Sequence, residues 1–162
     1  MWALIFLLAG CASKPDRYAG LPGLKEYDRD FMVAAAEQSI AAAQMCEIAQ
    51  GHGQTDAVRL LARQLLADRR QMLDEQINLG YEKGMPLPST PDAADQAAVR
   101  KLAHTGASDL DRRFIEELNE LLRAQLQLIT QASQKAIDPD VRAYAARMLP
   151  LLQQEIKQLN SR

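Results

Sequence analysis

Long stretches of helical periodicity constrain the fold of this chain more than any other feature. Between residues 26 and 159, apolar side chains recur at steps of three and four, the spacing that places them on one face of an α-helix. Alanine, leucine and glutamine are abundant, whereas valine, isoleucine and threonine are scarce. The pattern therefore predicts an all-α protein and argues against a β-sandwich, a barrel or a doubly wound sheet.

Local signals divide this region into four long helices and one short one. Thr55, Ser108 and Asp138 are predicted N-caps, the last of them followed by Pro139 in the first helical turn. Pro150 lies inside the last helix, where it should remove a backbone hydrogen bond and kink the axis. The expected helices run from about Glu26 to Gln50, Asp56 to Glu82, Asp92 to His104, after Ser108 to Ala136, and Pro139 to Leu159.

Four long amphipathic helices need one another to bury their apolar faces. The connection between the second and third of them, Lys83 to Ala107, is longer than a bundle turn requires and holds the short helix. We therefore predict a ferritin-like four-helix bundle with a short extra helix in the long connection between the second and third helices. This connection could cross the length of the bundle, and a simple up-down-up-down order stays open.

The first eleven residues have the pattern of an export signal. The apolar run Trp2 to Leu8 would rise only about 10 Å as a helix, too little to cross a bilayer core of about 30 Å. Leu8-Ala9-Gly10-Cys11 resembles the lipobox of bacterial lipoproteins, although no lysine or arginine precedes Lys14. The alternative is a buried apolar segment that carries an ordinary cysteine.

The lipobox resemblance implies a division of the chain and a location. Residues 1–10 would be a cleaved signal peptide, residues 11–25 a lipidated flexible tether rich in Pro and Gly, and residues 26–162 the bundle domain. Cys11 would carry acyl chains that hold the protein on a bilayer. With Ala12 after the cysteine, the resemblance implies the periplasmic side of the outer membrane.

Charge and motifs exclude several functions. With 19 basic and 21 acidic residues, the net charge of −2 does not suit a nucleic-acid partner. The sequence has no phosphate-binding loop, dinucleotide fingerprint, serine-hydrolase elbow or zinc-protease motif. We therefore expect no catalytic residue, no resident metal and no cofactor, and the chain is not predicted to be an enzyme.

Several short stretches resemble an uncharacterised bacterial family, a domain of unknown function of proteins assigned to the outer membrane, with a ferritin-like bundle. The matching stretches are Asp30-Phe31, Ala34-Ala35, Ile48-Ala49, Val58 to Ala62, Leu65 to Asp68, Leu102, Gly106, Leu110-Asp111, Phe114, Leu149-Pro150 and Leu152. They keep their order and spacing over most of the chain after Asp30.

The resemblance implies a polar centre inside the bundle, made of one acidic residue and three histidines. Those positions correspond here to Ala42, Arg69, Leu121 and Glu155, so no histidine is present. A carboxylate-bridged metal centre needs several inward Glu and His ligands, and this chain has no Glu-x-x-His pair. The resemblance thus predicts the place of a centre but not its metal.

Arg69 and Glu155 each fall on the apolar face of their helix, where an unpaired charge is very costly. One hypothesis is that the two form an interior ion pair. The alternative is that Arg69 extends its guanidinium to the edge of the bundle and pairs with Glu117 or with nothing.

Other reactive side chains have ordinary structural explanations. His52, between two glycines, is expected in a solvated turn, and His104 at the end of the short helix. Cys46 is expected to be a small buried residue, since no basic neighbour or histidine is evident to activate it.

Three functions remain open from the sequence. The favoured one is a non-catalytic, lipid-anchored periplasmic protein with a structural role or an envelope protein as partner. The second is a ferritin-like metal-binding or oxidative-stress protein with atypical ligands. The third is a carrier of an apolar ligand. The ligands considered for the second are Glu37, Glu47, Asp68 and Glu155.

Overall fold

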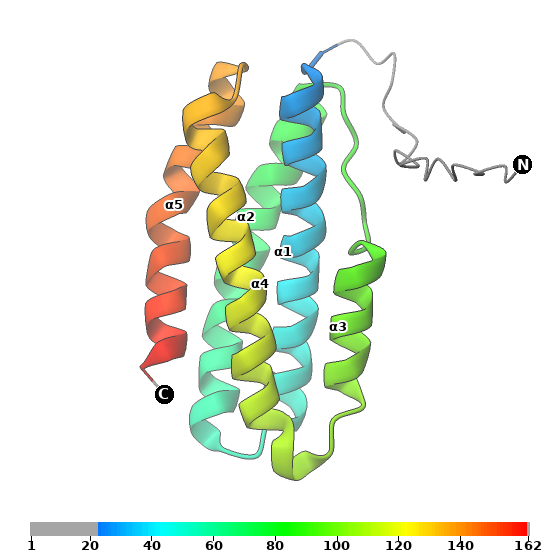
Figure 1. Cartoon of the computed structure of the whole chain (residues 1–162), viewed down its shortest axis with the longest axis vertical. Helices are drawn as coiled ribbons and strands as arrows, with labels where there is room; N and C mark the ends of the chain where they lie inside the picture. The colour runs from blue at the N-terminus through cyan, green and yellow to red at the C-terminus, as the bar shows by residue number, and fades with distance from the viewer. Residues whose placement is uncertain (1–22, 162) are drawn as a thin grey trace, which may run out of the picture.

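A computed structural model describes residues 23–161 and consists of helices and loops, without a strand in that range. Four long helices form a bundle, and a shorter one lies at its side (Figure 1). The helices are α1 (Glu26–His52), α2 (Asp56–Glu82), α3 (Ala93–Ala103), α4 (Ala107–Lys135) and α5 (Pro139–Asn160). The prediction of an all-α fold is confirmed. The predicted lipobox and Cys11 lie outside the described residues.

The order of the helices is set by one short turn, one long crossing and a second short turn. In Figure 1, α1 runs downward and α2 returns upward. The chain from Lys83 to Gly106, which includes α3, then passes back down the outside of the bundle, so that α4 runs in the same direction as α2. The connection therefore crosses the bundle, and the up-down-up-down alternative does not occur.

The core lies where the four long helices face one another. α1 packs against α2 and α4, α4 packs against α5, and among these neighbouring long helices the pair α2 and α5 makes the least contact. Buried alanines on α1, such as Ala35 and Ala42, let the neighbouring helices approach closely. Larger buried side chains from the other helices fill the centre, among them Leu61, Leu65, Phe114, Leu118, Tyr144 and Met148. Each such side chain contributes about 1.5–3 kcal/mol through burial.

Capping residues fix where helices begin. The Thr55 hydroxyl accepts a hydrogen bond from Val58 N at 3.3 Å, and Asp138 Oδ1 accepts from Asp140 N and Val141 N at 2.9 and 3.2 Å. Both N-caps are as predicted. The helix continues through Pro150, which lies on an exposed part of α5.

Two local predictions were wrong. α4 begins at Ala107 with Gly106 as its N-cap, because the Gly106 carbonyl already accepts from Asp109 N at 3.0 Å; Ser108 therefore lies inside the first turn. α1 continues through Gly51 and His52 and ends where Gly53 N donates to Ala49 O at 2.9 Å. His52 is thus an exposed residue of the last helical turn, and not a turn residue.

The start of the described chain is held against the bundle. Leu24, expected in the tether, is buried in the core, and Gly23 lies so close to the Lys83 carbonyl that a Cβ there would come within 2.7 Å of its oxygen. Asp28 is fully buried and accepts from the backbone nitrogens of Ile137 and Asp138 at 2.9 and 2.8 Å. Of the helices in residues 23–161, none has the length and apolar character needed to cross a membrane.

Candidate functional site

A chain of four polar side chains crosses the core, with one residue from each long helix. Ser39 on α1 accepts a hydrogen bond from Gln125 Nε2 on α4 at 2.9 Å. Gln125 Oε1 accepts from Arg69 Nη1 on α2 at 2.5 Å. Arg69 Nη2 in turn forms an ion pair with Glu155 Oε2 on α5. We call these four residues the polar centre.

The polar centre is buried, since the exposed fraction of each of its residues is 2% or less. Moving a guanidinium and a carboxylate out of water costs several kcal/mol per ion, and only close partners compensate for that cost. Here the carboxylate supplies the opposite charge and Gln125 supplies a second acceptor for the guanidinium. Both guanidinium Nη atoms of Arg69 are thus engaged by this chain's own groups.

Burial also changes the pKa of the titratable groups around Arg69. Burial lowers the pKa of Arg69 from 12.5 to about 10, while nearby Cys46 and Tyr144 act in the opposite direction. Arg69 therefore remains charged at neutral pH. Burial raises the pKa of the Cys46 thiol to about 12, and it also raises the pKa of Tyr144. Neither group is ionised at neutral pH, so neither offers an anionic ligand or nucleophile there.

The structure brings together Arg69 and Glu155, the two charged positions that the sequence placed on apolar faces. It does not bring Arg69 to Glu117, which instead accepts a hydrogen bond from Lys101 at 2.6 Å. Ala42 and Leu121 are buried but apolar, so they add nothing to the centre.

Sequence reasoning missed Ser39 and Gln125. Gln125 lies four residues after Leu121 and Ser39 three residues before Ala42, so each is one helical turn from a position that the family resemblance indicated. Both are polar residues on predicted inner faces, and their spacing of one turn from Ala42 and Leu121 was the available signal. Gln76 was missed in the same way; it is buried and donates to Met32 O at 3.0 Å.

The four acidic residues considered as atypical metal ligands do not form one cluster. Glu47 pairs with Arg70 at 3.0 Å on the surface, whereas Asp68 and Glu155 line one groove between α2 and α5. Glu37 is not among the residues lining that groove. Within residues 23–161, no three His, Cys, Asp or Glu side chains come together in a way that could hold a metal ion. The four candidate ligands are therefore not assembled into one metal centre in the part of the chain that the structure describes.

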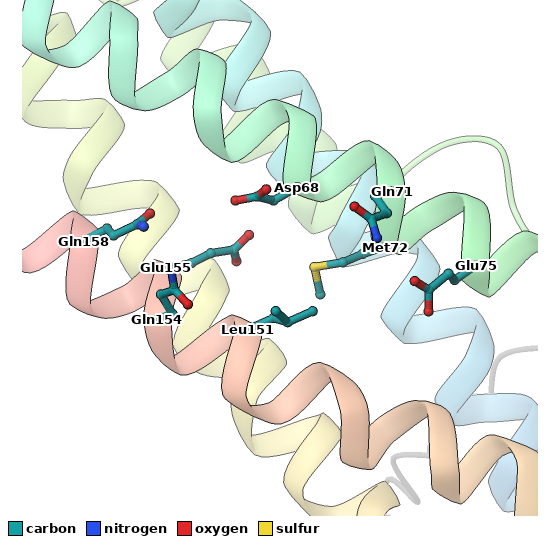
Figure 2. A pocket seen from close by; sticks show the side chains of 8 residues that line it. All are labelled: Asp68, Gln71, Met72, Glu75, Leu151, Gln154, Glu155 and Gln158. Atoms are coloured by element: carbon teal, nitrogen blue, oxygen red, sulfur yellow. The ribbon is translucent and has the colours of Figure 1, made fainter.

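The groove between α2 and α5 is small and has both polar and apolar walls. Figure 2 shows Glu155 pointing from α5 toward α2, with Met72 and Leu151 beside it. Its volume is about 160 Å³, below the range of about 300–1,000 Å³ typical of small-molecule sites. The groove is lined by Asp68, Gln71, Met72, Glu75, Leu151, Gln154, Glu155 and Gln158.

The remaining reactive side chains are not members of the polar centre. His104 caps the end of α3, where its Nδ1 lies 2.7 Å from the Arg100 carbonyl oxygen, and it is exposed. Cys46 is fully buried and is not in a disulfide.

The fold and the site define an all-α bundle protein whose helices are joined through a buried charged and polar centre. The chain belongs to the family described as a domain of unknown function (DUF4142), whose family model matches residues 14–161. No curated protein sequence matches the chain.

Two solved structures resemble this fold. One is a DUF305 fragment from Deinococcus radiodurans, with a TM-score of 0.75 and 17% identity over 86% of this chain and 97% of that one. The other is CopM in the Cu(II)-bound form, with a TM-score of 0.69 and 17% identity over 83% of this chain and 93% of that one. At this level of identity the resemblance concerns the fold alone.

Proposed function

We propose that this protein is a non-catalytic, lipid-anchored component of the bacterial cell envelope, on the periplasmic side of the outer membrane. In this proposal the bundle has a structural role or binds an envelope protein as its partner. It derives from a ferritin-like lineage whose metal-type residues have been replaced. The observation that carries the proposal is that Gln125 and Glu155 already engage the guanidinium of Arg69.

In this proposal the polar centre holds the four helices in one register. If α2 slid by a turn relative to α5, Arg69 and Glu155 would each be left as an unpaired buried charge. A slide of α4 would likewise remove the acceptor that Gln125 provides. The centre thus destabilises arrangements in which the helices are shifted along one another. The charges of Arg69 and Glu155 have a structural use here, whereas a metal site would need a carboxylate free to bind the ion.

The anchoring part of the proposal rests on Leu8-Ala9-Gly10-Cys11. Metabolic labelling with a palmitate analogue tests it in cells that express the full chain. We expect label on the wild type and on Cys46→Ser, and no label on Cys11→Ser. Equal labelling of all three variants, or of none, would contradict lipidation at Cys11.

A second candidate is metal binding, because one fold relative was solved with Cu(II) bound and because Asp68 and Glu155 share a groove. Metal analysis after dialysis against Cu(II), iron, manganese or zinc separates the two candidates. The structural proposal expects less than stoichiometric metal on the wild type. Stoichiometric metal that disappears in Asp68→Asn and in Glu155→Gln, but not in Glu47→Gln, would establish the alternative.

A further inference from the structure

One end of the bundle carries exposed apolar side chains next to the point where the described chain begins. The proximal end, as we call it, consists of residues 23–29, 79–85 and 132–142; it is the upper end in Figure 1. At this end Tyr81 is 71% exposed and Ile137 is 58% exposed. Exposed apolar side chains that gather in one region of a surface often mark a contact surface.

These side chains are tied to the first described residues by specific contacts. Gly23 lies against the backbone carbonyl of Lys83, two residues after Tyr81. The Asp28 carboxylate accepts a hydrogen bond from the backbone nitrogen of Ile137 at 2.9 Å. Lys83 Nζ lies 2.9 Å from Asp138 Oδ2, which joins the end of α2 to the turn before α5. The segment that leads back to Cys11 therefore leaves the bundle at the same end as Tyr81 and Ile137.

The length of chain between Cys11 and Gly23 limits how far an anchor can lie. Twelve residues span at most about 40 Å when fully extended. The far end of the bundle lies another 40 Å or so away, since α2 has 27 residues at about 1.5 Å each. An anchor at Cys11 therefore keeps the proximal end within about 40 Å of the lipid, whereas the far end can lie up to about 80 Å away.

Charge at this end does not favour an anionic partner over a neutral one. Its exposed charged residues are three basic and three acidic ones, Lys25, Lys135 and Arg142 against Glu26, Glu82 and Asp140. The remaining charged groups of this end, Asp28, Arg29, Lys83 and Asp138, also balance. A contact made here would thus depend on apolar and aromatic side chains, and tyrosine is enriched where bilayers meet water.

We propose that the proximal end docks on the surface of a lipid bilayer, with Tyr81 and Ile137 inserted at the interface. The inference rests on the proposed lipid anchor, because two side chains are too few to hold the protein there without it. Docking orients the bundle upright, so that Leu60 and the α1–α2 turn at the far end face away from the membrane.

The test uses residues 11–162, which retain every described residue and contain no tryptophan, since the single one is Trp2. Cys11 is coupled to a maleimide phospholipid in phosphatidylcholine vesicles, while buried Cys46 stays unmodified. Tyr81→Trp and Leu60→Trp then report on opposite ends of the same helix. The vesicles carry a nitroxide quencher on the acyl chain just below the headgroup.

We expect loss of fluorescence for Tyr81→Trp and none for Leu60→Trp, although Leu60 is itself 49% exposed. Adding Ile137→Asp to Tyr81→Trp should reduce the loss, because it places a charge at the interface. Equal quenching at both ends, or none at Tyr81→Trp, overturns the inference. In this experiment Cys11 is attached to the lipid by a chemical reaction and not by the cell. A failure of palmitate labelling in cells would therefore overturn the proposed function, while the quenching measurement would still test the docking separately.

Discussion

Arg69 on α2 and Glu155 on α5 form an ion pair in which neither side chain is more than 3% exposed. Of the neighbouring long helices in the bundle, the two that it joins make the least contact with each other. It therefore supplies a specific link on the side of the bundle where apolar packing is thinnest.

The first prediction concerns the energy of this pair. Arg69→Met or Glu155→Leu alone should lower the free energy of unfolding by about 3–5 kcal/mol, because each leaves a buried charge without its partner. The double variant should lose much less than the sum, since both charges are gone. Urea denaturation of the four proteins measures the coupling.

The neighbouring surface pair is a matched control. Arg70 and Glu47 lie 3.0 Å apart but are 64% and 52% exposed, so Arg70→Met should cost less than about 1 kcal/mol. If the losses in Arg69→Met and Glu155→Leu simply add in the double variant, the two residues are not coupled.

The second prediction concerns Gln125. In Gln125→Leu, Arg69 Nη1 loses its acceptor and Ser39 loses its donor, so the protein should lose about 1–3 kcal/mol of stability. Gln127 lies two residues further on the exposed side of α4, and Gln127→Leu should change stability by no more than about 0.5 kcal/mol. Thermal unfolding of both variants makes the comparison. A neutral Gln125→Leu would show that the amide contributes nothing to the centre.

Most of the helices could be predicted from the sequence because their apolar spacing and caps act locally. Thr55 and Asp138 cap the helices that follow them, as their side chains allow. The start of α4 was misplaced because serine is a stronger N-cap residue than glycine. The hydrogen bond from Asp109 N to the Gly106 carbonyl, and not the type of side chain, determines where this helix begins.

The candidate site was only partly predictable for a different reason. A charge on an apolar face shows that Arg69 needs a partner, but the choice between Glu155 and Glu117 depends on how α2 and α5 face each other. The contributions of Ser39 and Gln125 depend on the relative height of α1 and α4. One sequence contains the periodicity of each helix, but it does not contain their relative offsets.

The third prediction concerns pH and the turn between α1 and α2. Burial raises the pKa of Asp111, but hydrogen bonds from the Thr55 hydroxyl and from the backbone nitrogens of Gln54 and Thr55 outweigh it, so the pKa is lowered. A lowered carboxyl pKa contributes stability that is present above the unfolded value of 3.8 and is lost as the pH falls through the folded value.

The wild type should therefore lose stability on acidification below about pH 4, and Asp111→Asn should lose less over that range. At neutral pH Asp111→Asn should itself cost about 1 kcal/mol. Asp95 is a control of opposite sign, because burial and then Asp92 raise its pKa; Asp95→Asn should be neutral or stabilising at pH 7. Denaturant unfolding at several pH values gives all three results, and identical pH profiles of wild type and Asp111→Asn would contradict the assignment.

The fourth prediction concerns Cys46, which is fully buried on α1 beside the polar centre. Because burial raises the pKa of its thiol to about 12, and because the side chain is covered, a thiol reagent at pH 8 should modify it only after the protein unfolds. The assay is made in Cys11→Ser, so that Cys46 is the single thiol. Ala67→Cys in the same background places a thiol on the exposed face of α2 and should react at once. If Cys46 reacts in the native protein as fast as that control, α1 separates from the bundle in solution. The closed packing that keeps ligands away from Arg69 and Glu155 would then not hold.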